Sequence, residues 1–229
     1  MRIATRYLVR TMTLDDIPQV MEVERDSFPT MWPPTAFKRE LQQNSLARYI
    51  VVVEHRPDIT TATIDGPAVA AGSGGALERL FGEIRRFLSA DESPTLAPLE
   101  QRPELVVGLI GLWLLPDEAH IVTFGVRRSH RRGGIGELLL ISAIDLAQAN
   151  TETVVTLECR VSNEPALALY EKYAFEKVGL RPRYYSDDHE DAYVLTTADV
   201  TTRKYRESFD ELKSAHRRRW GDFETEAIL

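Results

Sequence analysis

A run of arginines and glycines between two apolar segments gives the first indication of chemistry in this sequence. After Val126 the chain reads Arg-Arg-Ser-His-Arg-Arg-Gly-Gly-Ile-Gly-Glu-Leu-Leu-Leu, and Ile121–Gly136 holds no acidic residue in a chain of net charge -7. Glycines tolerate positive φ and leave the backbone bare, while N–H groups at a helix start bind anions with help from the helix dipole. The spacing fits neither a Walker loop nor Gly-x-Gly-x-x-Gly. The pattern predicts a phosphate-binding turn at Arg131–Gly136, with a solvated basic turn as the alternative.

A second group of polar residues follows in the segment Leu-Glu-Cys-Arg-Val-Ser-Asn-Glu-Pro-Ala-Leu-Ala-Leu-Tyr-Glu-Lys-Tyr-Ala-Phe, which begins at Leu157. Glu158 is a candidate proton acceptor, although a carboxylate on a strand can also pair with Arg160, two residues on and on the same face. Tyr170 is a candidate proton donor, although its helical spacing also suits a core residue. Asn163 precedes Glu-Pro and suits a helix N-cap, a role that is compatible with contact to a ligand.

Taken in order, these motifs resemble the GNAT superfamily of acetyltransferases, and most closely its ribosomal-protein-alanine N-acetyltransferase branch. The shared features are Arg-x-x-Gly-x-Gly, a strand ending Leu-Glu-x-Arg-x-Ser-Asn, a helix with Ala-Leu-Tyr-Glu-Lys, a closing Phe175, and Tyr184-Tyr185 before Glu-Asp-Ala. The resemblance covers about residues 7–53 and 104–197. It implies an α/β (α+β) GNAT fold: a mixed, mostly antiparallel central sheet flanked by helices and splayed between strands 4 and 5.

The resemblance also implies acetyl-CoA as co-substrate and assigns roles to individual residues. Glu158 matches the general base of the branch, and Tyr170 matches its general acid toward the departing thiolate. The backbone of strand 4 would pair with the pantetheine arm, Arg131 would open the pyrophosphate loop, and the N–H groups after it would wrap the diphosphate. The expected co-substrate contacts are Phe124, Gly125, Val126, Arg131, Arg132, Gly133, Gly134, Ile135, Gly136, Glu137 and Asn163.

The acceptor is expected to be the α-amine at a protein N-terminus, and the resemblance suggests ribosomal protein S18. An α-amine has a reference pKa of about 7.7–8.0, against about 10.4 for lysine, so its deprotonation costs about 3.4 kcal/mol less at neutral pH. A carboxylate acting through water then suffices as base. The substrate would enter between Ser27–Trp32 and Arg183–Asp191, and the expected substrate contacts are Phe28, Trp32, Tyr184 and Tyr185.

Two other readings of the same residues remain open. The acceptor could instead be a lysine, a polyamine or another small amine, with the same machinery. Alternatively, the chain could be a non-catalytic acyl-CoA-binding module that uses its extra segments for docking. His120, at the start of strand 4, is a second candidate base or else an ordinary strand-edge histidine.

Three features depart from the family pattern. Ala174 stands where the family usually has glycine, and a left-handed conformation there would cost alanine about 1 kcal/mol. Phe124-Gly125 replaces the commoner Ile-Ala on strand 4. A segment at about 55–103, rich in proline and glycine, is too long for an ordinary connection. Within it Leu77–Leu88 has helical spacing, which predicts one amphipathic helix, with a disordered spacer as the alternative.

Apolar periodicity and turn residues predict the remaining elements and the domain plan. A single acetyltransferase domain is expected over 1–199, with the insertion between strands 2 and 3, and a helical C-terminal extension over 200–229 that docks in cis or in trans. The expected strands are 7–11, 49–53, 105–115, 119–126, 153–160, 175–181 and 192–196, and the expected helices are those after Asp16 and at 35–43, 136–150 and 164–173.

Composition limits the other function classes. The 229 residues include one cysteine, Cys159, which excludes an intrachain disulfide and fits a reducing compartment. The net charge of -7 argues against general nucleic-acid binding, and no apolar run is long enough for a membrane span. The five histidines lack ligand spacing, so no metal is expected. These observations predict a cytoplasmic protein without nucleic-acid or membrane partners.

Overall fold

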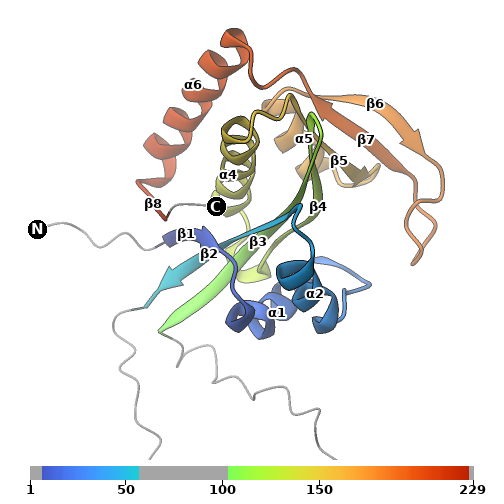
Figure 1. The fold of residues 1–229 in the computed structure, drawn as a ribbon, viewed down its shortest axis with the longest axis vertical. Coiled ribbons are helices and arrows are strands. Elements are labelled where there is room, and N and C mark those ends of the chain that lie inside the picture. Colours follow the sequence, from blue (N-terminus) through green and yellow to red (C-terminus); the bar gives the residue numbers. More distant parts are fainter. Residues whose placement is uncertain (1–6, 57–102, 227–229) are drawn as a thin grey trace, which may run out of the picture. The chain divides into compact units, whose positions relative to one another are not determined.

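A mixed eight-stranded sheet with helices on both faces forms the described part of the chain (Figure 1). The computed structural model describes residues 7–56 and 103–226. The strand order is β6-β7-β5-β4-β3-β2-β1-β8, and the pairs β4–β5 and β1–β8 are parallel while the others are antiparallel. The prediction of a mixed, mostly antiparallel sheet flanked by helices is therefore confirmed. In chain order the elements are β1 (Tyr7–Thr11), a 3-10 turn (Leu14–Asp16), α1 (Ile17–Ser27), α2 (Pro34–Gln43), β2 (Ala47–His55), β3 (Glu104–Leu115), β4 (Glu118–Val126), a 3-10 turn (Arg128–His130), α4 (Ile135–Ala149), β5 (Val154–Arg160), α5 (Glu164–Lys172), β6 (Phe175–Arg181), β7 (Ala192–Thr197), α6 (Arg203–Trp220) and β8 (Glu224–Thr225).

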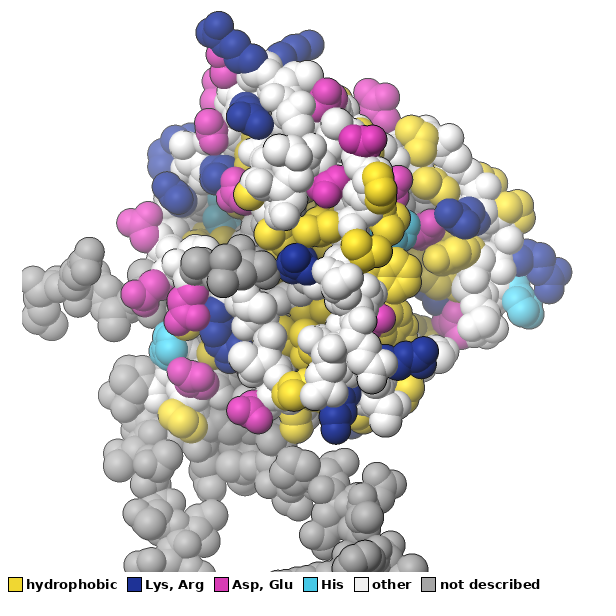
Figure 2. Space-filling view, in the orientation of Figure 1, with side chains coloured by type: hydrophobic (Ala, Val, Ile, Leu, Met, Phe, Trp, Pro, Cys, Tyr) yellow, Lys and Arg dark blue, Asp and Glu magenta, His cyan; other side chains and the backbone are white. Residues whose placement is uncertain are grey.

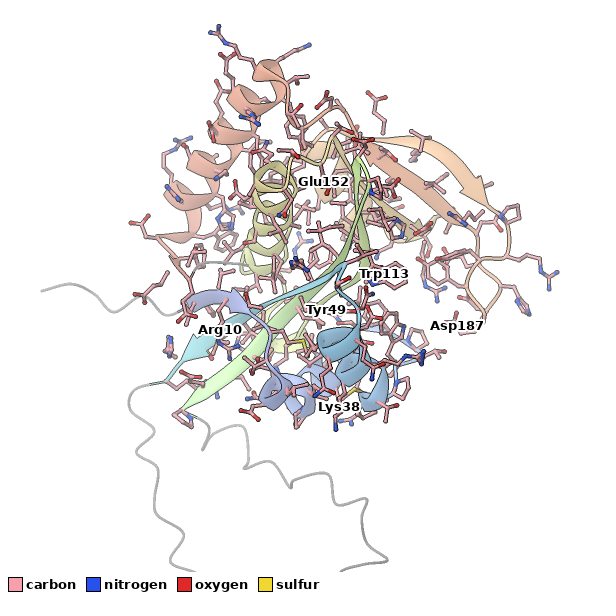
Figure 3. The ribbon with its side chains drawn as sticks, in the orientation of Figure 1. Arg10, Lys38, Tyr49, Trp113, Glu152 and Asp187 are labelled. Atoms are coloured by element: carbon pink, nitrogen blue, oxygen red, sulfur yellow. The ribbon has the colours of Figure 1, made fainter. Side chains whose placement is uncertain are left out.

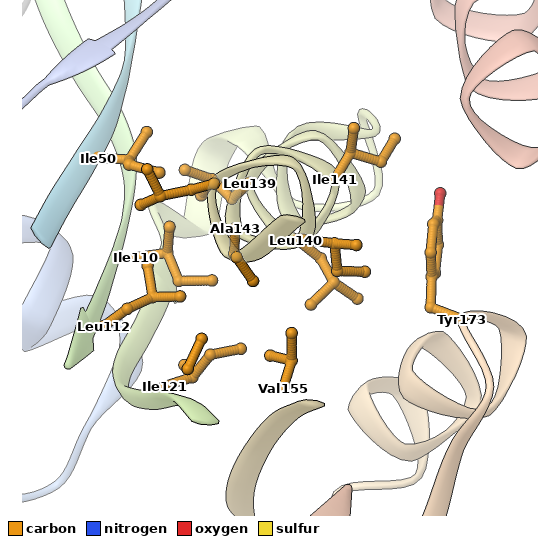
Figure 4. Packing of buried hydrophobic residues seen from close by; sticks show 14 of the residues in the cluster. Ile50, Ile110, Leu112, Ile121, Leu139, Leu140, Ile141, Ala143, Val155 and Tyr173 are labelled. Atoms are coloured by element: carbon orange, nitrogen blue, oxygen red, sulfur yellow. The ribbon is translucent and has the colours of Figure 1, made fainter. Parts of the chain in front are cut away.

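Alternating side chains of the central strands divide the core into two layers. On β2, Ile50 and Val52 face the cluster under α4, whereas Tyr49 and Val51 face the cluster under α1 and α2. This follows from the two-residue period of a strand, since successive side chains point to opposite faces. Figure 4 shows Leu139 and other residues of α4 packed against the strands. Both sheet faces are thus covered, and the site must lie at an edge or a gap.

The gap lies between β4 and β5. Their parallel pairing covers Glu118–Ile121 and Val154–Leu157, after which β4 continues to Val126 paired with β3, while β5 continues to Arg160 paired with β7. The two halves of the sheet therefore separate midway along the two strands. The splay predicted between strands 4 and 5 is observed here.

The hairpin of β6 and β7 extends away from the helices, and its tip carries residues 182–191 (Figure 1). The turn from α5 into β6 contains Ala174, where the family usually has glycine. Ala174 follows α5 with φ 60, in the left-handed region that favours glycine. The short α5 itself begins with Pro165 in its first turn and Asn163 as N-cap, as predicted.

The C-terminal segment docks on its own chain. α6 lies beside α4 and buries Tyr205, Phe209 and His216 (Figure 1). Beyond it, β8 adds to the sheet edge as a parallel partner of β1, a pairing that the sequence did not predict because the strand is only two residues long. Of the other expectations, the amphipathic helix at Leu77–Leu88 lies outside the described residues, and the domain boundaries stay a prediction.

Candidate active site

A cleft of about 450 Å³ opens where β4 and β5 separate. In Figure 2 hydrophobic side chains gather between the β6–β7 hairpin and the region of α1 and α2. The cleft brings together residues from both halves of the sheet and from the loop between α1 and α2. Among the predicted site residues, those that line it are Phe28, Trp32, Phe124, Glu158, Asn163, Tyr170, Tyr184 and Tyr185.

Glu158 lies in this cleft between His120 and Arg181. Its carboxylate oxygens lie 3.2 Å from His120 Nε2 and 3.0 Å from an Arg181 nitrogen, and its side chain is only 7% exposed. The hydrogen bond from His120 lowers the pKa of Glu158, and the charge of Arg181 adds to this effect. The same hydrogen bond raises the pKa of His120. Glu158 is therefore held as a carboxylate, coupled to an imidazole that can carry a proton.

The alternative pairing of Glu158 with Arg160 is not formed. Arg160 instead binds Asp187 at 2.7 Å, Asp188 at 2.8 Å and Glu190 at 3.0 Å, all on the β6–β7 tip. Arg181 was missed by sequence reasoning, because it lies on β6 and nothing in the linear pattern links it to β5. His120 is the second candidate base of the sequence, and it lies beside Glu158 because the register of the β4–β5 pair places it opposite Thr156.

Tyr170 lies in α5 with its ring among aromatic neighbours. The ring centroid lies 6.3 Å from that of Phe124 and 5.5 Å from that of Phe175, and the residue is 6% exposed. Burial raises the pKa of the Tyr170 hydroxyl well above its ordinary value. The hydroxyl therefore stays protonated at neutral pH, which suits a proton donor. Tyr170 thus belongs to the hydrophobic core and also lines the cleft.

Glu24 and Ser27 also line the cleft, and neither is among the contacts expected from the sequence. Glu24 of α1 is 2% exposed and accepts a hydrogen bond of 2.8 Å from Thr123 Oγ1 on β4. Burial raises its pKa, so this carboxyl is easier to protonate than an exposed one. Ser27 Oγ is buried without a hydrogen-bond partner among the described residues, and a Cβ at Gly125 would lie 2.8 Å from it. The glycine that departs from the family pattern thus makes room for this hydroxyl beside β4.

The predicted pyrophosphate loop leads from the 3-10 turn into α4. Gly134 is the N-cap of α4 with φ 82, and Arg132 also has a positive φ of 65. The first N–H groups of α4 have no partner within the helix and carry the positive end of its dipole. A Cβ at Gly136 would meet only ordinary contacts, the nearest at 3.6 Å, so the backbone is accessible there. This backbone geometry agrees with the predicted phosphate-binding turn, and its role stays a prediction.

Two charged side chains of this region hold the loop itself. The Arg131 guanidinium donates to the carbonyl oxygens of Val126, at 3.1 Å, and Asp26, at 2.5 Å. The carboxylate of Glu137 accepts hydrogen bonds from Lys172 and from the Tyr173 hydroxyl, at 2.5 and 2.8 Å. Burial opposes ionisation of Glu137, yet these hydrogen bonds leave its pKa below the ordinary value. The side chains of Arg131 and Glu137 thus fix the loop, and the backbone is left to meet a ligand.

Aromatic residues line the cleft from the β6–β7 tip and from the α1–α2 side. Tyr184 and Tyr185 lie on the β6–β7 tip with their rings edge to face at 5.2 Å, and the Arg160 guanidinium stacks 3.8 Å from the Tyr185 ring. Trp32 packs on Phe37 from the α1–α2 side. Figure 3 shows Asp187 on the hairpin tip and Trp113 on β3, two further residues that line the cleft. The predicted substrate contacts therefore face a single cleft.

Asn163 has the capping role that its sequence context indicates. Its side-chain oxygen accepts from Ala166 N at 3.4 Å, and the residue also lines the cleft.

The described residues contain no group of three or more His, Cys, Asp or Glu side chains arranged to hold a metal ion. No helix in 7–56 or 103–226 has the length and apolar character needed to cross a membrane.

Comparison with known proteins gives consistent matches. Residues 68–175 match the model of the acetyltransferase (GNAT) family. The chain is 31% identical to an N-alpha-acetyltransferase, RimI, of Mycobacterium tuberculosis over 82% of this chain and 89% of the relative. It is 28% identical, over 83% of this chain and 95% of the relative, to a Bacillus subtilis protein whose name gives it as an alanine N-acetyltransferase of ribosomal protein bS18. Among solved structures, Arabidopsis thaliana NAA60 in complex with acetyl-CoA superimposes with a TM-score of 0.58 at 16% identity, over 84% of this chain and 99% of that one.

Proposed function

Because this chain belongs to the GNAT family of acetyltransferases and is an N-acetyltransferase that uses acetyl-CoA, we propose that its acceptor is the α-amine at the N-terminus of a protein. The observation that carries the proposal is the cleft between β4 and β5, which joins a held carboxylate, Glu158, and a protonated hydroxyl, Tyr170, with aromatic walls. The cleft is lined by side chains of the α1–α2 loop and of the β6–β7 tip, so an extended peptide end could be contacted from both sides.

Acetyl-CoA supplies an acetyl group activated as a thioester, and the protein must manage two protons around it. The attacking amine has to be neutral, and the departing sulfur has to receive a proton. Glu158 accepts the amine proton, directly or through water, and the His120 imidazole beside it gives that proton a second position. Tyr170, whose hydroxyl burial keeps protonated beforehand, donates a proton to the departing sulfur and regains one from solvent, to which Glu158 releases the amine proton.

The diphosphate of the co-substrate is proposed to bind the loop from Arg132 to Glu137. The left-handed Gly134 and the start of α4 support this assignment. The backbone of β4 at Phe124–Val126 extends from the cleft toward the loop, beyond its pairing with β5. Asn163 at the start of α5 completes the predicted set of contacts. No step of the proposal needs a metal ion.

An α-amine acceptor agrees with a base of this strength. The pKa of Glu158 is lowered by His120 and Arg181, so it removes protons weakly. An α-amine with a pKa of about 7.7–8.0 is partly neutral at physiological pH, whereas lysine with about 10.4 is not. Relatives named for N-terminal acetylation support the same class, and ribosomal protein S18 is the first substrate to test. We place the reaction in the cytoplasm.

The test compares acceptors and variants in one assay. The purified protein with acetyl-CoA should acetylate peptides bearing the S18 N-terminus, and should act far less on free lysine, spermidine or peptides with a blocked N-terminus. Glu158→Gln and Tyr170→Phe should each lower kcat about 10²–10⁴-fold, the range for loss of an acid or base. Retained acetyl-CoA affinity in both variants would show that chemistry and not folding was lost. A preference for lysine or spermidine contradicts the α-amine proposal, and full activity of both variants contradicts the assigned roles.

A further inference from the structure

The C-terminal helix reaches the predicted pyrophosphate loop at two points. His216 Nε2 lies 3.0 Å from the carbonyl oxygen of Gly134, and the Trp220 ring lies against the Gly134 Cα. A Cβ at Gly134 would be 2.7 Å from two atoms of that ring. We propose that α6 is a working part of the co-substrate site, in which His216 and Trp220 position the loop for the diphosphate. The inference rests on the proposed role of the loop.

The hydrogen bond has a defined direction. A carbonyl oxygen only accepts, so Nε2 of His216 must carry the proton. Burial lowers the pKa of His216, and Glu137, Lys172 and Arg217 are the charged groups facing it. The imidazole is therefore neutral at physiological pH, with its donor turned to Gly134. Leu138 N donates to the same carbonyl at 2.9 Å, so both lone pairs of this oxygen are occupied.

Fixing this carbonyl also fixes the amide that follows it. The peptide unit between Gly134 and Ile135 is planar and trans, so its C=O and N–H point in opposite directions. With the oxygen held toward Leu138 and His216, the Ile135 N–H points out of the helix start, where an anion would bind. Gly134 has φ 82, and glycine alone moves readily between such conformations. The Trp220 ring, packed on the Cα, restricts that movement.

The position of α6 is in turn fixed by the rest of the fold. The Tyr205 hydroxyl donates to the Tyr173 carbonyl at 3.0 Å, and Phe209 packs edge-on against the Tyr173 ring. The Tyr173 hydroxyl donates to Glu137 in the first turn of α4. Phe223, which precedes β8, has its ring centroid 5.2 Å from that of His216 and 5.9 Å from that of Tyr7. The loop is thus connected to α6 directly and through Tyr173.

Loss of this support should appear as weaker co-substrate binding. When a binding-competent conformation is only a fraction of the free population, the apparent dissociation constant rises by the inverse of that fraction. If the loop without its α6 contacts is competent about one-tenth of the time, the Kd for acetyl-CoA rises about tenfold. Binding of the peptide and the rate at saturating acetyl-CoA depend on the β4–β5 cleft and should change little.

The experiment uses two variants of the full chain. His216→Phe keeps an aromatic ring at the position but removes the hydrogen-bond donor. Trp220→Ala truncates a partly exposed side chain, which the fold should tolerate. Both should raise the acetyl-CoA Kd, measured by calorimetry, and its KM by about tenfold, with kcat and peptide KM within about twofold. Lys213→Met is the matched control, since it breaks the ion pair of α6 with Asp145 at 2.6 Å but leaves both loop contacts. The control should bind as the wild type does. Unchanged acetyl-CoA affinity in both test variants, with thermal unfolding confirming a folded chain, overturns the proposal.

Gly136→Asp separates this inference from the proposed function. The added Cβ meets no close contact, and an acidic residue in the first helical turn favours α4, so the variant should fold. Its carboxylate should repel the diphosphate and abolish measurable acetyl-CoA binding. If this variant binds as the wild type does, the loop assignment fails. If it loses binding while His216→Phe and Trp220→Ala do not, the loop assignment stands and the role of α6 fails.

Discussion

At the scale of single residues, the central feature of the site is Glu158 and the charged or polar side chains that bind it. It is bound by His120 on β4 and Arg181 on β6, so a single carboxylate links three strands around the cleft. Each partner lowers its affinity for protons. These contacts fix the position of Glu158 but make it a weaker base. A weak base is sufficient for an amine that is already partly neutral.

The His120 pair predicts a pH-dependent stability. The hydrogen bond to Glu158 raises the pKa of His120, and Glu118 at 3.3 Å acts in the same direction. The stabilisation is fully present below the unfolded pKa of about 6.5 and is lost as pH rises through the higher folded value. His120→Gln, which removes the titration, should therefore lower the free energy of unfolding more at pH 6 than at pH 9. Urea unfolding at both pH values measures this, and equal losses would contradict it.

Ala174 predicts a stabilising substitution. Its φ of 60 places an alanine in the left-handed region at the end of α5. Ala174→Gly should raise the free energy of unfolding by about 1 kcal/mol, because glycine adopts this conformation without the steric penalty of a Cβ. The midpoint of urea unfolding should rise with an unchanged slope. The same change at Ala143, buried inside α4, is the control and should destabilise.

At the scale of elements, the β6–β7 hairpin depends on one residue of β5. Arg160 binds three carboxylates of the hairpin tip and stacks on Tyr185. Arg160→Met keeps an unbranched side chain but removes these ion pairs, so the hairpin tip is held less firmly. The KM for the peptide should rise about fivefold, with the acetyl-CoA KM unchanged. Arg203→Met, which breaks an exposed pair with Glu207, should alter neither, and an equal rise of both constants in Arg160→Met would contradict the assignment.

The elements were predictable because their signals are local. Pro116-Asp117 marks the β3–β4 turn, and Pro165 marks the start of α5. The predicted site residues could likewise be named, since the motifs that carry them are contiguous. The partners of those residues could not be predicted: Arg181 reaches Glu158 from another strand, and His216 reaches Gly134 across 82 residues. Such contacts depend on the tertiary arrangement of the elements, and local periodicity gives no information about that arrangement.

At the scale of the whole molecule, the parting of β4 from β5 predicts a pattern of amide exchange. Beyond Ile121, β4 is paired with β3 alone, so its amides that face β5 should exchange with solvent in the free protein. Acetyl-CoA should slow exchange within Val122–Val126 at short labelling times, because the proposed arm covers that edge. The amides of β2, which has partners on both sides, serve as the control and should not change. Equal protection of both strands would point to global stabilisation alone.

The same half-paired strand bears on how the molecule avoids aggregation. An exposed strand edge is a template on which another chain can add, and proteins usually cover or charge such edges. Here the unpaired length of β4 lies inside a cleft walled by Phe28 on one side and Tyr184 on the other. Inside the cleft, this edge is less accessible to the edge of another sheet than it would be on the open surface. The enzyme can thereby keep a strand edge free for a ligand without presenting it to other chains.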